Sequence, residues 1–187
     1  MAKKPNGLAY VFKGAAAVAA GAPTTDANGQ PVRRYVKDLM RVGKWYQPGN
    51  DRTVNVTAEM LDHWAKTHAA MSAAGNRVPV PAEHTDEVEA NRGFVEQMYV
   101  ADGTLYGVLE LVGEDAIKLA SRAEVSIYVP PTFTDGQKNK YESPITHVAL
   151  VNFPVVSGQG KFIPIAASLN AEYALEALEM DWKEIAT

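Results

Sequence analysis

Apolar residues recur with helical spacing in the segment from residue 57 to residue 75. Four of them repeat every three or four positions and therefore share one helix face: Leu61, Trp64, His68 and Met71. Thr57 is a good helix N-cap, and Gly75 stands where such a helix would end. The pattern predicts a long α-helix with this buried stripe, in which His68 is a packed core residue.

Short apolar stretches separated by turn signals predict β-strands in much of the remaining chain. Valine and proline alternate over residues 77–83, and because proline cannot donate a hydrogen bond within a sheet, we expect an edge strand there. Segments 94–100 and 104–112 flank the Asp102-Gly103 dipeptide, which is typical of tight hairpin turns. Further strands are expected over 8–13, 125–129 and 145–151, and a short helix over 114–122.

Two segments differ in composition from the part of the chain between them. Residues 14–31 are rich in Gly, Ala, Pro, Thr and Asn and are expected to form a flexible loop. Residues 167–187 carry one apolar stripe on an acidic background, which predicts an amphipathic C-terminal helix. We therefore distinguish a domain over 1–166 from this helix, which is expected to dock on the domain, contact a second subunit or continue into a longer segment.

The order of the predicted elements limits the fold class. The strands are short, and most are not separated by the long helices of a parallel α/β sheet. We expect an α+β fold with a small, closed or strongly curved antiparallel sheet. At 187 residues the chain is about one domain long, and it needs no disulfide to bury a core.

Composition and charge exclude several classes of function. The net charge of −4 does not favour a broad nucleic-acid surface, and the absence of cysteine excludes disulfides, thiolate zinc sites and cysteine nucleophiles. No apolar run is long enough to span a membrane. Lys3 and Lys4 precede the alanine-rich run 14–22 in the order of a signal peptide, which keeps a secreted hydrolase as an alternative.

The sequence does not favour a metal or cofactor site. His63 and His68 lie five residues apart on the predicted helix, whereas zinc-binding helices use histidines four residues apart. No glycine-rich phosphate loop and no dinucleotide fingerprint is present. We therefore expect neither a metal nor a cofactor.

Three residues could supply the groups of a serine hydrolase. Ser126 and His147 lie within two predicted strands, and His84 stands where the valine-proline strand gives way to an acidic turn. A serine hydroxyl needs an adjacent imidazole to accept its proton, and a third group must orient that imidazole. Each residue alone also suits a structural role, and spacing along the chain does not show that the three meet.

The order of several segments resembles the tailed-phage prohead proteases, most closely the Mu-like I protein type. The resemblance covers roughly residues 35–165. It is carried by Val78-Pro79-Val80 through His84-Thr85, the hairpin from Gly93 to Gly107, Val125-Ser126-Ile127-Tyr128, and the segment from His147 to Pro154. This family shares its fold with the herpesvirus assemblins, so the resemblance implies a small β-barrel surrounded by helices.

The resemblance also implies a function and a site. It implies a serine endopeptidase that cleaves scaffold, coat-protein extensions and itself during capsid maturation. His84 then corresponds to the catalytic histidine, Ser126 to the nucleophile and His147 to the third member of the triad. The implied enzyme is a homodimer without a cofactor, acts on the scaffold and major capsid protein, and works in the host cytoplasm inside the assembling prohead. Residues 167–187 could then begin a scaffold linker.

Two departures from the family pattern leave alternatives open. One branch of the family has Tyr-x-Ser-Pro where this chain has Tyr128 to Pro131, so an inactive protease-fold protein that acts as a scaffold or capsid component is the alternative. Ser143 is a further, weaker candidate nucleophile. Residues 148–160 contain no arginine or lysine to stabilise an oxyanion, so backbone N–H groups or Asn152 would have that role.

Overall fold

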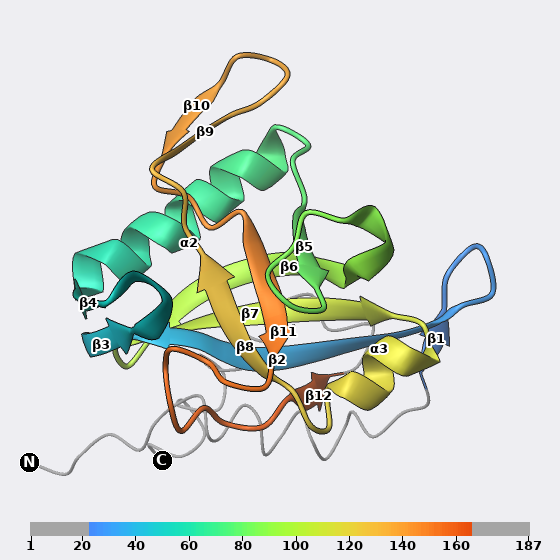
Figure 1. Ribbon diagram of the computed structural model, residues 1–187. Helices are drawn as coiled ribbons and strands as arrows, with labels where there is room; N and C mark the ends of the chain where they lie inside the picture. Colours follow the sequence, from blue (N-terminus) through green and yellow to red (C-terminus); the bar gives the residue numbers. More distant parts are fainter. Residues whose placement is uncertain (1–22, 166–187) are drawn as a thin grey trace, which may run out of the picture.

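The computed structural model describes residues 23–165 (Figure 1). The strand expected over 8–13, the signal-like N-terminus and the C-terminal helix over 167–187 lie outside the described residues. Of the loop expected over 14–31, the part from residue 23 on is described. It contains the short strand β1 (Thr24–Thr25), which pairs with the start of β2 and so makes this part of the predicted loop a hairpin.

The largest element is a six-stranded antiparallel sheet with the order β1-β2-β7-β6-β5, in which β12 also pairs with β2. The strands after β1 are β2 (Pro31–Arg41), β5 (Val78–Pro81), β6 (Asn91–Ala101), β7 (Thr104–Val112) and β12 (Ile163–Ile165). The hairpin predicted across Asp102-Gly103 is confirmed, and both turn residues have positive φ, as a tight hairpin turn requires. The edge strand predicted over 77–83 is confirmed as β5.

Helix α2 (Ala58–Ala73) packs on β6. The hydroxyl of Thr57 accepts from the N–H of Met60, and the four predicted stripe residues are all buried, so the predicted helix is confirmed. The buried imidazole of His68 bonds to the carbonyl of Val95 at 3.2 Å, which satisfies its ring in the core as expected. A short helix, α3 (Glu114–Leu119), follows β7 as predicted.

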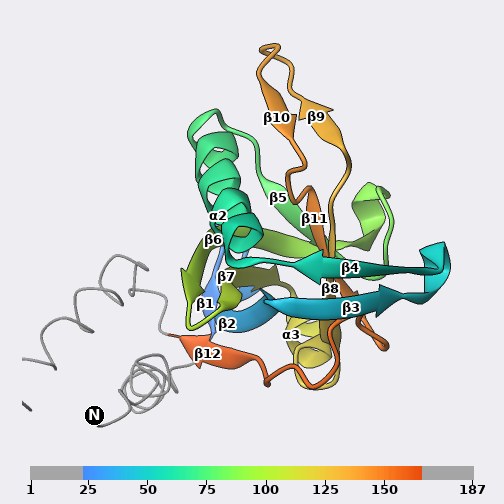
Figure 2. The same ribbon diagram turned by 90° about the vertical axis from the view of Figure 1, so that its left-hand side faces the viewer.

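Three two-stranded ladders accompany the large sheet. β8 (Glu124–Tyr128) and β11 (His147–Val151) are the strands predicted over 125–129 and 145–151. They pair with each other and cross in front of the large sheet in Figure 1. β3 (Gly43–Gln47) and β4 (Arg52–Val56) form a hairpin around a 3₁₀ turn at Pro48–Asn50. β9 (Thr132–Thr134) and β10 (Lys140–Glu142) form an arm that projects beyond α2 (Figure 2).

One carboxylate organises the tip of the β9–β10 arm. Asp135 accepts hydrogen bonds from the side chains of Asn76, Asn139 and Tyr141 and from the backbone N–H groups of Gln137 and Asn139. These bonds, those of Asn139 foremost, lower the pKa of Asp135 to about 2. Because Asn76 lies three residues after the end of α2, the arm is tied to the end of that helix.

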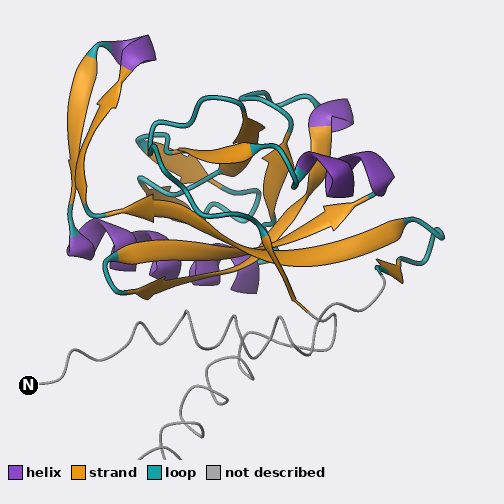
Figure 3. Ribbon diagram, turned by 90° about the horizontal axis from the view of Figure 1, so that it is seen from below, coloured by secondary structure: helices purple, strands orange, loops and turns teal. Residues whose placement is uncertain are grey.

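The barrel expected from the sequence was wrong. The described residues are mostly antiparallel β-structure with only two α-helices, and no sheet among them closes into a barrel. Figure 3 shows the predominance of strands over helices. Closure would require continuous pairing around the ring. Instead, β11 meets β5 through the single bridge between Ala82 and Leu150, and the other edge of β8 is occupied at Val125 by the side chain of Gln159.

Candidate active site

The ladder of β8 and β11 places two of the three candidate residues on one face. Ser126 lies opposite Ala149, and Tyr128 lies opposite His147. Because side chains alternate along a strand, Ser126 and His147 are diagonal neighbours on one face, with Cβ atoms about 7 Å apart. The expectation that His147 lies in a strand is confirmed, and every residue of β11 is buried.

His84 reaches this face from the end of β5. The N–H of Glu83 donates to the carbonyl of Leu150 in β11 at 2.9 Å, beside the parallel bridge formed by Ala82. Glu83 itself has φ +66°, in the left-handed region that residues other than glycine adopt infrequently. The regular alternation of side chains along β5 is interrupted at this turn, and His84 lies beside His147 at the start of β11.

His84 and His147 form a hydrogen-bonded pair. Nδ1 of His84 lies 2.8 Å from Nε2 of His147, and Nδ1 of His147 lies 4.0 Å from a carboxylate oxygen of the exposed Asp86. One set of tautomers has His84 donating from Nδ1 to His147, while His147 carries its own proton on the nitrogen that faces Asp86. Nε2 of His84 is then an unprotonated acceptor, as a general base requires.

The ring of Tyr128 covers His147. The two rings stack with centroids 4.9 Å apart and an angle of 12° between their planes, and the Tyr128 ring lies 6.4 Å from that of His84. Tyr128 holds one face of the His147 ring, while the hydrogen bond to His84 holds its edge. Sequence analysis did not identify this contact, although Tyr128 shares a strand face with Ser126, which was a usable signal.

Burial keeps both histidines of the pair in the neutral form near pH 7. Burial is the main reason that the pKa of His84 lies below its ordinary value, and Glu83 opposes this effect. The pKa of His147 is also lowered, first by burial and then by His84, while Asp86 opposes the shift. A neutral imidazole is the form that can accept a proton from a serine.

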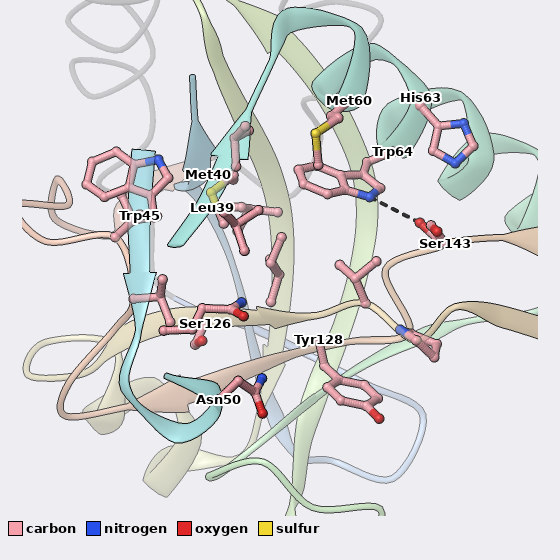
Figure 4. Close-up of a pocket in the computed structure, with 18 of the residues that line it drawn as sticks. Leu39, Met40, Trp45, Asn50, Met60, His63, Trp64, Ser126, Tyr128 and Ser143 are labelled. Carbon is pink, nitrogen blue, oxygen red and sulfur yellow. Dashed lines mark hydrogen bonds between the residues drawn. The ribbon is translucent and has the colours of Figure 1, made fainter. Parts of the chain in front are cut away.

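Ser126 lies at a cavity beside the free edge of β8. Its side chain is largely buried, and it lines a cavity of about 740 Å³ between β8, α2 and the β3–β4 hairpin. In Figure 4, Tyr128 extends from β8 to the side away from Trp64 and Met60. No hydrogen bond joins Ser126 to His84 or His147 among the described residues, so the structure pairs the two histidines but does not show the serine bonded to them.

The opposite wall of this cavity is apolar. It is formed by Leu39, Met40, Trp45, Met60 and Trp64 (Figure 4). The indole N–H of Trp64 donates to the carbonyl of Ser143 at 3.1 Å, and Nε2 of His63 bonds to the carbonyl of Glu142 at 2.7 Å. Helix α2 thus holds the loop after β10 in place at the mouth of the cavity.

The remaining sequence candidates do not join the histidine pair. The hydroxyl of Ser143 bonds to the carbonyl of Pro131 at 3.5 Å and not to an imidazole. Asn152, the candidate oxyanion residue, is exposed and does not line the cavity. Within residues 23–165, no group of three histidine or carboxylate side chains could hold a metal ion, and no helix is long and apolar enough to cross a bilayer.

Comparisons with known proteins add no relative. No protein-family model matches the chain, and no curated protein matches it significantly.

Proposed function

We propose that the chain is a serine endopeptidase in which Ser126 is the nucleophile, His84 is the general base and His147 orients His84. One observation carries this proposal: Nδ1 of His84 bonds to Nε2 of His147, which leaves Nε2 of His84 without a hydrogen-bond partner among the described residues. A catalytic histidine uses its nitrogens in this way, with Nδ1 toward the orienting group and Nε2 toward the serine.

The proposed reaction follows from these positions. Nε2 of His84 takes the proton of Ser126 as its Oγ bonds to the carbonyl carbon of the scissile peptide. The resulting imidazolium is stabilised through its Nδ1–H bond to His147, whose own proton faces Asp86. The C–N bond then breaks as His84 returns the proton to the leaving amine. In the second half, a water molecule gives a proton to His84 as its oxygen bonds to the acyl carbon, and the C–O bond to Ser126 breaks as His84 returns that proton to Oγ.

The proposed substrates are the scaffold, the extensions of the major capsid protein and the chain itself, in a homodimer that works within an assembling phage prohead. Support comes from the segment order that resembles the prohead proteases, in particular the segments that contain His84, Ser126 and His147. The barrel of that family is not part of this proposal.

A specific observation favours a second candidate, a catalytically inactive scaffold or capsid component. Ser126 makes no hydrogen bond to either histidine among the described residues, and Pro130 stands where one branch of the family has its serine. In this alternative the paired histidines are structural, and β8 is simply a packed strand.

The experiment that separates the two is co-expression with the capsid and scaffold proteins, followed by mass spectrometry of each chain. A peptidase trims them, and Ser126→Ala abolishes trimming while Ser143→Ala leaves it intact. Ser72→Ala, on the exposed side of α2, is the matched neutral control. Full trimming by a folded Ser126→Ala variant would assign the nucleophile elsewhere, and no trimming by the wild-type chain would favour the inactive component.

A further inference from the structure

The side chain of Gln159 binds the free edge of β8 as a neighbouring strand would. Its Oε1 accepts from the backbone N–H of Val125 at 2.9 Å, and its Nε2 donates to the carbonyl of Val125 at 2.8 Å. A single carboxamide therefore makes both hydrogen bonds that one residue of an antiparallel partner makes. This edge of β8 already binds an amide group at one position.

The loop that carries Gln159 is fixed to β2. The guanidinium of Arg41 donates to the carbonyls of Ser157 and Gly158, each at 2.8 Å. On the other side of Gln159, the carboxylate of Asp38 accepts from the N–H of Gly160 at 3.0 Å.

The buried ammonium of Lys37 adds a further contact to this loop. It donates to the carbonyl of Gly160 and also bonds to Glu124, at the start of β8, at 3.0 Å. These contacts hold the loop on both sides of Gln159. Its carboxamide therefore has a fixed position at one end of the exposed edge of β8.

Beyond Val125 the edge of β8 is open for a short distance. β8 pairs only with β11 among the described strands, and Ile127 lies two residues after Val125. Its N–H and C=O therefore point to the same side as those bound by Gln159, and Ile127 is one of the residues that line the cavity. Pro130 and Pro131 follow, and a proline has no N–H to offer. The edge open to hydrogen bonding is bounded by Gln159 at one end and by the two prolines at the other.

We propose that this edge binds an extended polypeptide and that Gln159 sets the register in which it binds. Because Gln159 occupies Val125, the first residue that an incoming strand can pair with is Ile127, directly after Ser126. The apolar wall of the cavity, with Met60 and Trp64, accepts alternate apolar side chains of that strand. This inference rests on the proposed function, for which it makes Gln159 a positioning residue that fixes which peptide bond lies beside Ser126.

The first test compares cleavage sites in an unfolded probe protein, β-casein. For the wild-type chain we expect each cleaved peptide bond to lie a constant number of residues from an apolar residue of β-casein. Gln159→Ala frees the N–H and C=O of Val125, so we expect a second set of cuts displaced by two residues, because a strand keeps its faces only in steps of two. Gln159→Glu, which keeps the size and one of the two bonds, is expected to give a smaller second set.

Gln137→Ala is the matched control, since Gln137 lies at the tip of the β9–β10 arm, away from the cavity. It should leave the cuts unchanged. An unchanged set of cuts in both Gln159 variants, with melting curves like that of the wild type, would overturn the role of Gln159 in register.

The second test measures binding without cleavage and so separates this inference from the proposed function. In Ser126→Ala, added β-casein is expected to slow hydrogen exchange of the Ile127 amide about tenfold or more and leave that of Val125 unchanged. With Gln159→Ala added, both amides should gain protection. Protection of Ile127 without cleavage by the wild type would support the binding edge and reject the peptidase. Cleavage without protection of Ile127 would retain the peptidase and reject the binding edge.

Discussion

The side chains of His84 and His147 meet through nitrogens that belong to opposite positions of the two rings, Nδ1 of one and Nε2 of the other, 2.8 Å apart. This arrangement gives the pair a direction. In the tautomers assigned above, His84 holds the proton between the rings, so its outer nitrogen carries none and the outer nitrogen of His147 carries one. In the proposed reaction His84 is therefore the base.

The activity should depend on pH with a midpoint below the ordinary histidine pKa of about 6.5. Burial lowers the pKa of both histidines, so the neutral, active pair persists to lower pH. We expect kcat/KM to rise from acidic pH and to become level by about pH 7. Initial rates of coat-protein processing from pH 4.5 to 9 measure this. A midpoint above 7 would contradict a base whose pKa is lowered by burial.

Stability should also fall in mild acid, and His68 should account for part of the loss. Burial holds the pKa of His68 below its unfolded value, so below about pH 6.5 the unfolded chain binds a proton that the folded chain does not. The free energy of unfolding should therefore decrease as pH falls from 6.5 toward the folded pKa. Urea unfolding of the wild type and of His68→Gln at pH 7.5 and 5.5 tests this, and the variant should lose less stability on acidification.

Lys37→Ala should destabilise the chain by about 3 kcal/mol, because it removes the buried cation that Asp38, Glu124 and the Gly160 carbonyl share. Urea unfolding measures the change. Lys118→Ala is the control, because Lys118 and Glu114 form an exposed ion pair between side chains one helical turn apart. Equal effects of the two substitutions would show that burial of Lys37 contributes nothing to stability.

Removing the ring of Tyr128 should slow the reaction while removal of its hydroxyl should not. The ring stacks on His147, so Tyr128→Ala leaves the orienting histidine free to turn, and kcat should fall about tenfold with less change in KM. Tyr128→Phe keeps the stack and should keep the rate. A loss of rate in Tyr128→Phe would instead give the hydroxyl a role.

Helices and turns could be predicted from the sequence where a segment buries one of its faces or contains a typical turn dipeptide. The α2 stripe and the turn at Asp102-Gly103 follow from spacing and turn chemistry, and both are confirmed. The long strand β2 was not predicted. Its centre holds Lys37, a charged residue that is fully buried because acidic groups and a carbonyl satisfy it, so the expected alternation is absent. The burial pattern of β2 depends on partners distant in the sequence, such as Glu124 and Gly160, so the sequence of the strand alone does not show it.

The candidate site shows the same limit. The identities of His84, Ser126 and His147 could be proposed from sequence, but their mutual distances depend on contacts between β5 and β11. The turn at Glu83 that directs His84 is stabilised by the Leu150 carbonyl, 67 positions later in the chain. The prediction of a closed barrel was wrong for a related reason. The sequence around β8 does not show that the side chain of Gln159, 34 positions after Val125, binds the edge of that strand.

The anchored tip of the β9–β10 arm has a consequence for the lifetime of the proposed peptidase. A projecting hairpin is where one copy would first digest another, because loop tips are the preferred sites of nicking. Cleavage requires the segment to open into an extended form, and Asp135, directly after β9, opposes opening by binding Asn139 in the turn, Tyr141 in β10 and Asn76 at once. Because its carboxylate stays ionised down to about pH 2, this resistance to self-digestion should persist through mild acid.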